Sequence, residues 1–159
     1  MNQINILTGP INSGKTTRLT NWVNRQNNCA GILAPVRGGL RYLYAIHSHK
    51  RKLLEIKEFK IAENRVIRIG DFCFSREVFE WARGELLFAL KQKPSWLIID
   101  EIGPLELTGN GLEPAVSKIL NELKSYDQVR LVLVIREQLL DAFIHTYRIN
   151  INEVGYIQL

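Results

Sequence analysis

Residues 9–16 read Gly9-Pro10-Ile11-Asn12-Ser13-Gly14-Lys15-Thr16. This stretch satisfies the phosphate-loop pattern G-x-x-x-x-G-K-[ST] at every fixed position. In that pattern, successive backbone N–H groups surround the β-phosphate of a nucleotide, and the N-terminus of the following helix adds positive potential. The apolar residues 4–7 precede the stretch and an amphipathic pattern follows it, which is the strand–loop–helix setting that the pattern requires. The stretch predicts a fold that binds a nucleoside triphosphate.

The positions of the loop have different expected tasks. Gly14 lets the backbone approach the phosphates where a Cβ atom would obstruct it. Lys15 can reach the β- and γ-phosphates, and the Thr16 hydroxyl can bind Mg²⁺, the expected cofactor. We expect the nucleotide to contact the loop and the residue after it, namely Gly9, Pro10, Ile11, Asn12, Ser13, Gly14, Lys15, Thr16 and Thr17.

A second motif lies in the middle of the chain, where the sequence reads Trp96-Leu97-Ile98-Ile99-Asp100-Glu101. Ligands bind beyond the carboxyl ends of parallel strands, so an apolar strand that ends in two acids points them at the ligand. Asp100 would then hold Mg²⁺, directly or through water. Glu101 would polarise a water for attack on the γ-phosphate. The alternative is that both acids cap the next segment, but beside a phosphate loop they favour hydrolysis.

Hydrolysis also needs a group that stabilises developing charge besides Lys15. Arg136 follows the continuous apolar run of residues 129–135, so it should reach the same edge of the sheet. If its strand lies between the other two, as in P-loop ATPases of the Asp-Glu type, Arg136 sits beside the γ-phosphate. The alternative is a solvent-exposed cation that begins the next helix. Position gives no support to the other arginines that we weighed, which are Arg37, Arg41, Arg68 and Arg83.

The strand and helix patterns, together with the phosphate loop, predict an α/β fold that binds a nucleotide. Two uninterrupted apolar strands, residues 96–99 and 129–135, indicate a mainly parallel sheet flanked by helices on both faces. Other strands are expected at residues 4–7, 30–34, 66–69 and 155–159, and helices after the loop, after Ser75, near Pro114 and at residues 138–145. An antiparallel hairpin of residues 40–46 and 53–59 forms an excursion at about 37–60. We expect one domain over residues 1–159.

The composition is that of a globular protein, with 46% hydrophobic and 23% charged residues. No stretch approaches the roughly 18 apolar residues that a membrane span needs, and the start of the chain lacks the features of a signal peptide. Cys29 and Cys73 lie in apolar runs without metal-ligand spacing, which favours buried free thiols in a reducing compartment. We expect a cytoplasmic protein that acts as a monomer and has no membrane partner.

The net charge of +5 raises the question of a nucleic-acid partner. The charges are scattered except for the run Lys50-Arg51-Lys52, which we interpret as a solvated hairpin tip, with RNA contact as the alternative. His47 and His49 precede this run at the spacing of metal ligands on a strand. No third ligand lies nearby, which favours an exposed turn.

The segments together resemble a known family. Leu7-Thr8-Gly9…Gly14-Lys15-Thr16-Thr17 and the run Asp100-Glu101-Ile102-Gly103-Pro104-Leu105-Glu106-Leu107 are similar to the small nucleoside-triphosphatases first described from hyperthermophiles, also called the cancer-related nucleoside-triphosphatases. Residues 31–41 resemble the hairpin of that family, and residues 69–74 resemble its mid-chain motif. The resemblance covers nearly the whole chain. It implies a compact P-loop NTPase fold of the Asp-Glu type, with an additional strand in the sheet, and slow Mg²⁺-dependent hydrolysis of several nucleoside triphosphates.

By position, the resemblance assigns Lys15 and Thr16 to phosphate and magnesium, Asp100 to magnesium, and Glu101 to the base. Glu106 matches an acidic position of the motif but receives no role. Pro10 and Asn12 depart from relatives, which are often richer in glycine or basic residues there, and this departure puts the base preference in doubt.

The leading prediction is a phosphohydrolase that converts ATP, GTP and other nucleoside triphosphates to the diphosphate and phosphate. The first alternative is a kinase for a nucleoside or small metabolite, against which Glu101 argues. The second is a nucleotide-dependent RNA-binding switch that uses the basic run. The sequence contains no Asn-Lys-x-Asp or Thr-Lys-x-Asp motif for reading guanine, which weakens a GTPase-type switch.

Overall fold

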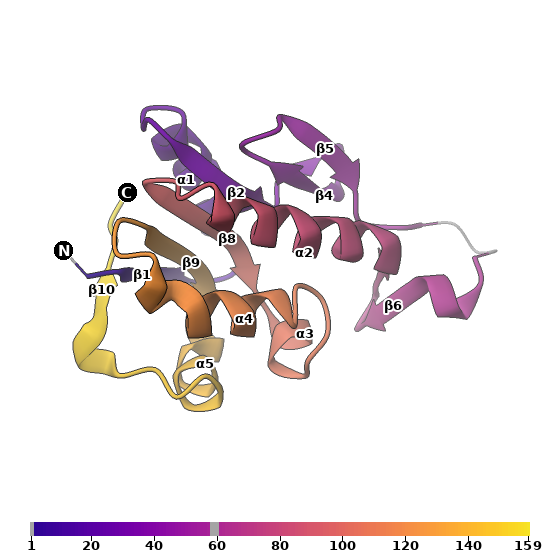
Figure 1. Cartoon of the computed structure of the whole chain (residues 1–159). Helices are drawn as coiled ribbons and strands as arrows, with labels where there is room; N and C mark the ends of the chain where they lie inside the picture. Colours follow the sequence, from indigo (N-terminus) through magenta and orange to yellow (C-terminus); the bar gives the residue numbers. More distant parts are fainter. Residues whose placement is uncertain (1, 58–60) are drawn as a thin grey trace.

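A twisted sheet runs through the middle of the molecule, as the computed structural model in Figure 1 shows; it describes residues 2–57 and 61–159. Within these residues, eight strands form the sheet in the order β10-β1-β9-β8-β2-β4-β3, and β5 pairs with β4. The strands are β1 (Ile4–Gly9), β2 (Cys29–Leu33), β3 (Val36–Arg37), β4 (Leu40–Ala45), β5 (Lys50–Leu53), β8 (Trp96–Ile102), β9 (Arg130–Arg136) and β10 (Val154–Tyr156). The pairs among β10, β1, β9, β8 and β2 are parallel, which confirms the predicted sheet.

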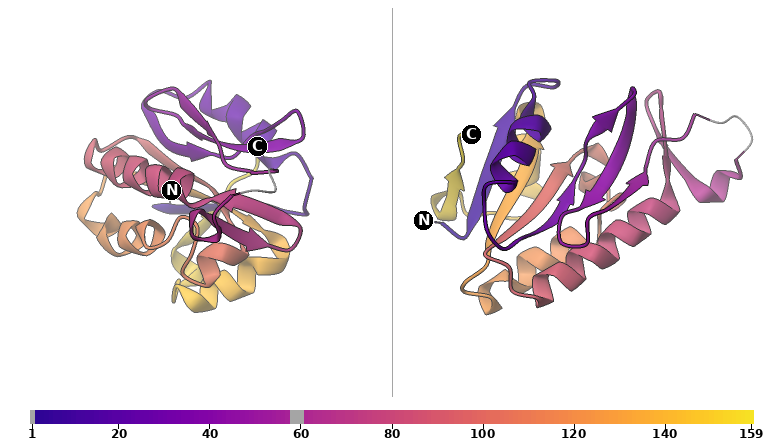
Figure 2. Two further views of the ribbon diagram at one scale, coloured as in Figure 1. Left: turned by 90° about the vertical axis from the view of Figure 1, so that its right-hand side faces the viewer. Right: turned by 90° about the horizontal axis from the view of Figure 1, so that it is seen from above.

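Helices cover both faces of the sheet, as Figure 2 shows most clearly in the view from above. The helices are α1 (Lys15–Val23), α2 (Arg76–Lys91), α3 (Pro104–Leu107), α4 (Ala115–Glu122) and α5 (Leu140–Thr146). Leu19 and Val23 of α1 pack in one apolar cluster, while Phe79 of α2, Val116 of α4 and Phe143 of α5 pack in another. The two clusters lie on opposite faces.

The apolar run of β9 explains why both faces are covered. Leu131, Leu133 and Ile135 belong to the cluster under α2 and α4, whereas Val132 and Val134 belong to the cluster under α1. Successive side chains of a strand point to opposite faces, so a strand between two helical layers needs apolar residues at every position.

The strand order brings the predicted functional residues to one edge. Strand β9 lies between β1 and β8, with Gly9 opposite Arg136 and Asp100 opposite Val134. Three adjacent parallel strands therefore bring their carboxyl ends together, with the phosphate loop after β1, the two acids at the end of β8 and Arg136 at the end of β9. The arrangement expected of the Asp-Glu type, in which the strand of Arg136 lies between the strand before the phosphate loop and the strand of the two acids, is confirmed.

A two-stranded hairpin, β6 (Val66–Ile69) and β7 (Phe72–Ser75), projects beyond the N-terminal end of α2 (Figure 1). The predicted strand at residues 66–69 is confirmed. The predicted helix cap is also confirmed, because Ser75 Oγ accepts a hydrogen bond of 3.2 Å from the backbone N–H of Val78.

The prediction of a strand at residues 53–59 is wrong. The second strand of that hairpin is β5, which ends at Leu53, and residues 58 and 59 of the prediction lie outside the described residues. After β5 the chain changes partners: Leu54 N–H still donates to Arg41 on β4, but Ile56 N–H donates to Cys73 on β7. The apolar spacing of this segment reflects burial between two different hairpins and not one regular strand.

The basic run and the histidines also differ from their predicted setting. Lys50, Arg51 and Lys52 lie on β5 and not at the tip, although their side chains are exposed as expected. His47 lies in the turn but is not exposed there: its Nε2 is 2.7 Å from Glu85 Oε2 on α2. A tertiary contact that the sequence does not reveal shelters this histidine.

Two other features bear on predictions from composition. Cys29 and Cys73 are free and partly buried, and burial raises the pKa of the Cys29 thiol to about 11, so that thiol stays protonated and unreactive at neutral pH. None of the helices in the described part of the chain combines the length and the apolar character that crossing a membrane requires.

Candidate active site

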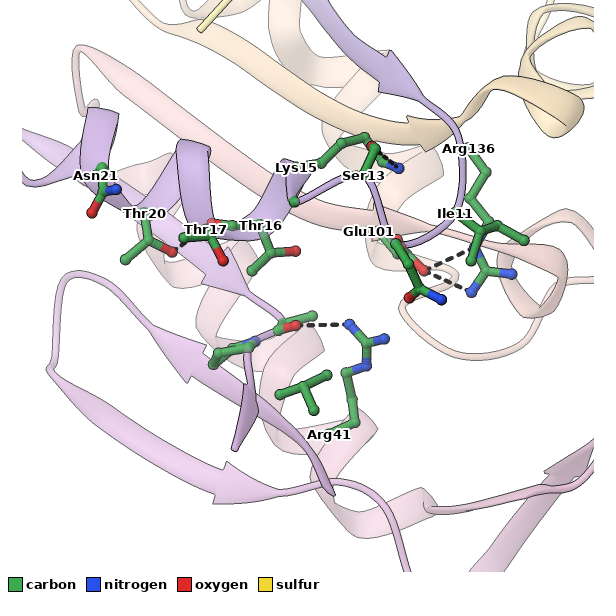
Figure 3. A pocket seen from close by; sticks show the side chains of 15 residues that line it. Ile11, Ser13, Lys15, Thr16, Thr17, Thr20, Asn21, Arg41, Glu101 and Arg136 are labelled. Atoms are coloured by element: carbon green, nitrogen blue, oxygen red, sulfur yellow. Dashed lines mark hydrogen bonds and ion pairs between the residues drawn. The ribbon is translucent and has the colours of Figure 1, made fainter. Parts of the chain in front are cut away.

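The phosphate loop turns sharply into α1. Gly14 precedes the helix with φ 78° and ψ 21°, a left-handed conformation that glycine adopts without steric cost. The Lys15 ammonium folds back across the loop and donates to Pro10 O at 2.6 Å and Gly9 O at 3.2 Å. Ser13 Oγ lies 3.4 Å from the same ammonium, as Figure 3 shows. The lysine is therefore held against its own loop, with 6% exposure, and it lines the cavity described below.

Asp100 lies at the end of β8 and has no exposed surface. Its Oδ2 accepts hydrogen bonds from Thr16 Oγ1 at 2.9 Å and from the Ala34 N–H at 3.1 Å. Burial raises the pKa of this carboxyl to about 6; the hydrogen bond from Ala34 opposes this rise and the charge of Glu101 adds to it. Oδ1 has no hydrogen-bond partner among the described residues.

A buried carboxylate oxygen without a partner is costly, and a cation at this position would satisfy it. Thr16 and Asp100 offer oxygen atoms, which are the ligands that Mg²⁺ prefers. Nowhere in residues 2–57 and 61–159 do three His, Cys, Asp or Glu side chains gather into a site that could hold a metal alone. The chemistry of the site thus fits an ion shared between one carboxylate, one hydroxyl and the phosphates of a substrate.

Glu101 and Arg136 meet at the edge of the sheet. Arg136 donates from Nη2 at 2.9 Å and from Nε at 3.2 Å, both to Oε1 of Glu101. The two side chains keep 29% and 19% exposure, so the pair faces the cavity from a half-buried position. The structure places Arg136 beside the acids, and the alternative of a cation that projects freely into solvent is wrong. Sequence reasoning did not anticipate the ion pair itself.

Arg41 reaches the same cavity from β4, as Figure 3 shows. Its Nη1 donates to the carbonyl of Ala34 at 2.8 Å, which anchors the guanidinium beside the end of β2. Unlike Arg136, it forms no salt bridge with any residue that the structure describes. Position along the chain had given no support to Arg41. The turn Arg37-Gly38-Gly39 and the resemblance of residues 31–41 to a family hairpin indicated a strand here, but neither indicated that Arg41 reaches the site.

These groups, apart from Asp100, line one cavity of about 440 Å³. Figure 3 shows α1 along one side of it, Glu101 and Arg136 on another, and Arg41 across from them. The residues that line it are Ile11, Asn12, Ser13, Gly14, Lys15, Thr16, Thr17, Thr20, Asn21, Ala34, Pro35, Val36, Arg41, Glu101 and Arg136. Gly9 and Pro10, predicted to contact the nucleotide, are not in the lining; they lie behind it and hold Lys15 through their carbonyls.

Glu106, which received no role from the sequence, braces the segment after β8. Its Oε2 accepts from Gly103 N–H at 2.9 Å and its Oε1 from Leu112 N–H at 3.1 Å. Gly111 passes so close that a Cβ atom there would lie 2.3 Å from Oε1. Burial raises the pKa of Glu106 to about 7 despite these hydrogen bonds. The Glu106 carboxyl thus links Gly103, just after β8, to Leu112 at the other end of the following loop.

A family model described as NTPase matches residues 5–156. No curated protein matches the sequence significantly.

Two solved structures share the fold. The crystal structure of THEP1 from the hyperthermophile Aquifex aeolicus matches with a TM-score of 0.72 and 22% identity, over 98% of this chain and 89% of that chain. The solution structure of a human cancer-related nucleoside triphosphatase matches with a TM-score of 0.65 and 18% identity, over 99% and 88%. At these identities the likeness confirms the predicted fold, and the site has to be argued from its own residues.

Proposed function

This chain belongs to the NTPase family, and from that premise we propose that it hydrolyses nucleoside triphosphates to the diphosphate and phosphate with Mg²⁺ in the cavity beside its phosphate loop. The observation that carries the proposal is the position of Glu101. Its carboxylate lines the same cavity as Lys15 and Thr16, on the strand next to that of Arg136. A base that faces the phosphate loop is what transfer to water requires.

The triphosphate would enter along the N-terminus of α1. Backbone N–H groups of the loop would bind the β-phosphate, and Lys15 would exchange its bonds to the carbonyls of Gly9 and Pro10 for phosphate oxygens. Thr16 and Asp100 would hold Mg²⁺. When bound, the ion neutralises negative charge on the β- and γ-phosphate oxygens.

Glu101 would take the proton of the attacking water. Within the described residues, hydrogen bonds reach only its Oε1, which Arg136 holds from two nitrogens. Oε2 is thereby left to accept from a water, and the carboxylate is fixed in orientation. The guanidiniums of Arg136 and Arg41 would stabilise the charge that develops on the γ-phosphoryl group.

We further propose a broad choice of base and a monomeric enzyme. Beside the residues that would hold the phosphates, the cavity wall consists of short polar side chains such as Thr20 and Asn21 and the exposed aliphatic Ile11 and Val36. Such a wall can contact a nucleobase without a set of hydrogen bonds that would select one base over another. A single chain supplies the loop, both acids and both arginines, so the proposed chemistry needs no second subunit.

The proposal is tested by phosphate release from purified protein with ATP, GTP, CTP or UTP, with Mg²⁺ and without any added acceptor. Glu101→Gln should lower turnover by about 10²–10⁴-fold and leave triphosphate affinity within a few-fold. The matched control is Glu137→Gln, which removes an exposed acid just beyond β9 and should change neither quantity. Undiminished turnover in Glu101→Gln would remove this residue from the reaction.

A further inference from the structure

A second cavity of about 300 Å³ lies on the far side of Glu101 from the phosphate loop. Its walls come from the β6–β7 hairpin, the start of α2, strand β4 and the loop that Glu106 braces. This volume stands at the lower end of the range for small-molecule sites. The proposed hydrolysis makes no use of it.

The two cavities share a wall. Arg41, Glu101 and Arg136 line both of them, together with Ala34. Lys15 and Thr16 line the first cavity only, whereas Asp100 and Glu106 line the second only. A triphosphate bound at the loop would therefore present its terminal phosphoryl group to the shared wall, and a molecule in the second cavity would meet it there.

The lining of the second cavity is mainly apolar and partly aromatic. Phe72 and Phe74 are stacked, with ring centroids 5.8 Å apart and an interplanar angle of 11°. Phe79 meets Phe74 edge to face at 6.0 Å. Phe72 is nevertheless 54% exposed, which is unusual for a phenylalanine that packs beside other aromatic rings. A flat ring in the cavity could stack in this aromatic corner.

The walls of the cavity carry charges of both signs, and most of the charged groups already have partners. Arg136 is paired with Glu101, and both oxygens of Glu106 accept backbone hydrogen bonds. Arg41 faces Asp100, whose pKa its charge lowers. No single sign of charge dominates the walls, so they favour an uncharged occupant with an apolar body.

We propose that this cavity binds a second substrate, a small uncharged molecule with a planar ring and a free hydroxyl, and that the enzyme transfers the γ-phosphoryl group to that hydroxyl. The inference rests on the proposed use of Glu101 as the base. The hydroxyl oxygen would form a bond to the γ-phosphorus, and the bond from that phosphorus to the β–γ bridging oxygen would break. The diphosphate leaves with the electron pair, and the hydroxyl proton passes to Glu101 and then to solvent. Hydrolysis is the same reaction with water at the acceptor position.

The first experiment measures binding of 2-naphthylmethanol, a neutral aromatic alcohol that is itself fluorescent, to the full chain. Phe72→Ser removes the exposed member of the stacked pair and should weaken binding by about fivefold. Ile69→Trp fills the cavity and should abolish saturable binding. Phe88→Ser is the matched control, because Phe88 is 55% exposed on the outer face of α2 and lines neither cavity; it should leave binding unchanged.

The second experiment supplies γ-³²P-labelled ATP and Mg²⁺ with 2-naphthylmethanol, pyridoxine or adenosine as acceptor. It measures the ratio of labelled phosphate ester to free phosphate. At least one acceptor should give an ester, in a ratio that rises with acceptor concentration. That ratio should fall severalfold in Phe72→Ser, fall to background in Ile69→Trp, and stay the same in Phe88→Ser.

The outcomes separate this inference from the proposed hydrolysis. Phosphate release that depends on Glu101, without any ester from the three acceptors, would overturn the second-substrate site and leave the hydrolase intact. Saturable binding of 2-naphthylmethanol without an ester would also overturn it, since the cavity would then be no acceptor site. Loss of both phosphate release and ester in the wild type would instead refute the proposed function.

Discussion

The phosphate loop and the carboxyl end of β8 face one cavity, but they are held in different ways. Among the described residues, the Lys15 ammonium bonds only to groups two to six positions away. Asp100 accepts from Thr16, 84 positions away, and from Ala34, 66 positions away. Glu101 is held by Arg136, 35 positions away. One side of the site is a local structure, and the other exists only when the sheet is assembled.

This difference separates affinity from stability. Lys15 is as buried as Glu106, with 6% exposure each, but in the described part of the chain its ammonium bonds only within the loop, so its substitution disturbs no contact between distant segments. Substitutions around β8 alter buried groups, since Asp100 has no exposed surface and Glu106 is only 6% exposed. We therefore expect substitutions in the loop to weaken nucleotide binding without lowering the stability of the fold. Substitutions at the strand end should lower both stability and turnover. Four predictions test this contrast.

The largest effect should come from Lys15→Ala. This substitution removes the one ammonium at the mouth of the loop and should weaken triphosphate binding by about 10²–10³-fold. Isothermal titration with a non-hydrolysable triphosphate measures it, and Lys118→Ala, an exposed lysine on α4, serves as the control. The urea midpoint of Lys15→Ala should stay near that of the wild type. A large loss of stability with intact affinity would reverse our assignment of the two sides.

The second prediction concerns Glu106 on the other side. Because burial raises its pKa from 4.5 to about 7, the folded chain binds its proton more tightly than the unfolded chain. The resulting stabilisation is complete below about pH 4.5 and is lost as the pH rises to about 7, which amounts to roughly 3 kcal/mol. Asp100, whose pKa is also raised, adds a change of the same sign.

Urea unfolding between pH 4 and pH 8, with EDTA present, isolates the share of Glu106. Glu106→Gln cannot titrate, so its stability should decline less over this window by about 3 kcal/mol. It should also be less stable than the wild type at low pH, because an amide NH₂ replaces one accepting oxygen. Glu137→Gln, at an exposed position, should keep the wild-type profile. Identical profiles for Glu106→Gln and wild type would show that this carboxyl does not titrate as the structure indicates.

A smaller effect is expected from Arg41→Ala. Arg41 comes from β4, far from the loop in sequence, and its guanidinium is free to meet developing charge. Turnover should fall by about 10-fold or somewhat more, with triphosphate affinity changed by less. Arg37→Ala, on the exposed strand β3, is the control and should stay within twofold. Equal turnover in the two variants would leave Arg136 as the sole arginine of the reaction.

The smallest effect should come from Thr16→Ser. Serine keeps the hydroxyl that bonds to Asp100 Oδ2, so Mg²⁺-dependent turnover should change by no more than a few-fold. Thr16→Val keeps the shape and removes the oxygen, and should raise the Mg²⁺ concentration that half-maximal turnover requires by at least 10-fold. This pair sharpens the comparison, because Thr16 is the point where the local loop and the assembled strand end touch. If serine and valine behave alike, the hydroxyl holds no ion.

Several elements could be predicted from the sequence because their signals are contiguous. The phosphate loop, the apolar strand that ends at Asp100 and Glu101, and the helix capped by Ser75 each occupy one short segment. One prediction that failed, a strand at residues 53–59, concerned a segment that pairs first with β4 and then with β7. Periodicity reports that residues are buried but not which partner buries them.

Local signals in the sequence are enough to predict the nucleotide-binding loop, the order of most strands and helices, and the acids at the end of a buried strand. Backbone conformation and binary patterning act over a few residues, so they can be read from neighbouring positions. Only the tertiary structure decided that Arg136 pairs with Glu101, that Arg41 reaches the same cavity, and that Phe72, Phe74 and Phe79 gather behind it. These contacts join residues that are far apart in the chain, and they form only when strand order and packing bring the carboxyl ends of the sheet together.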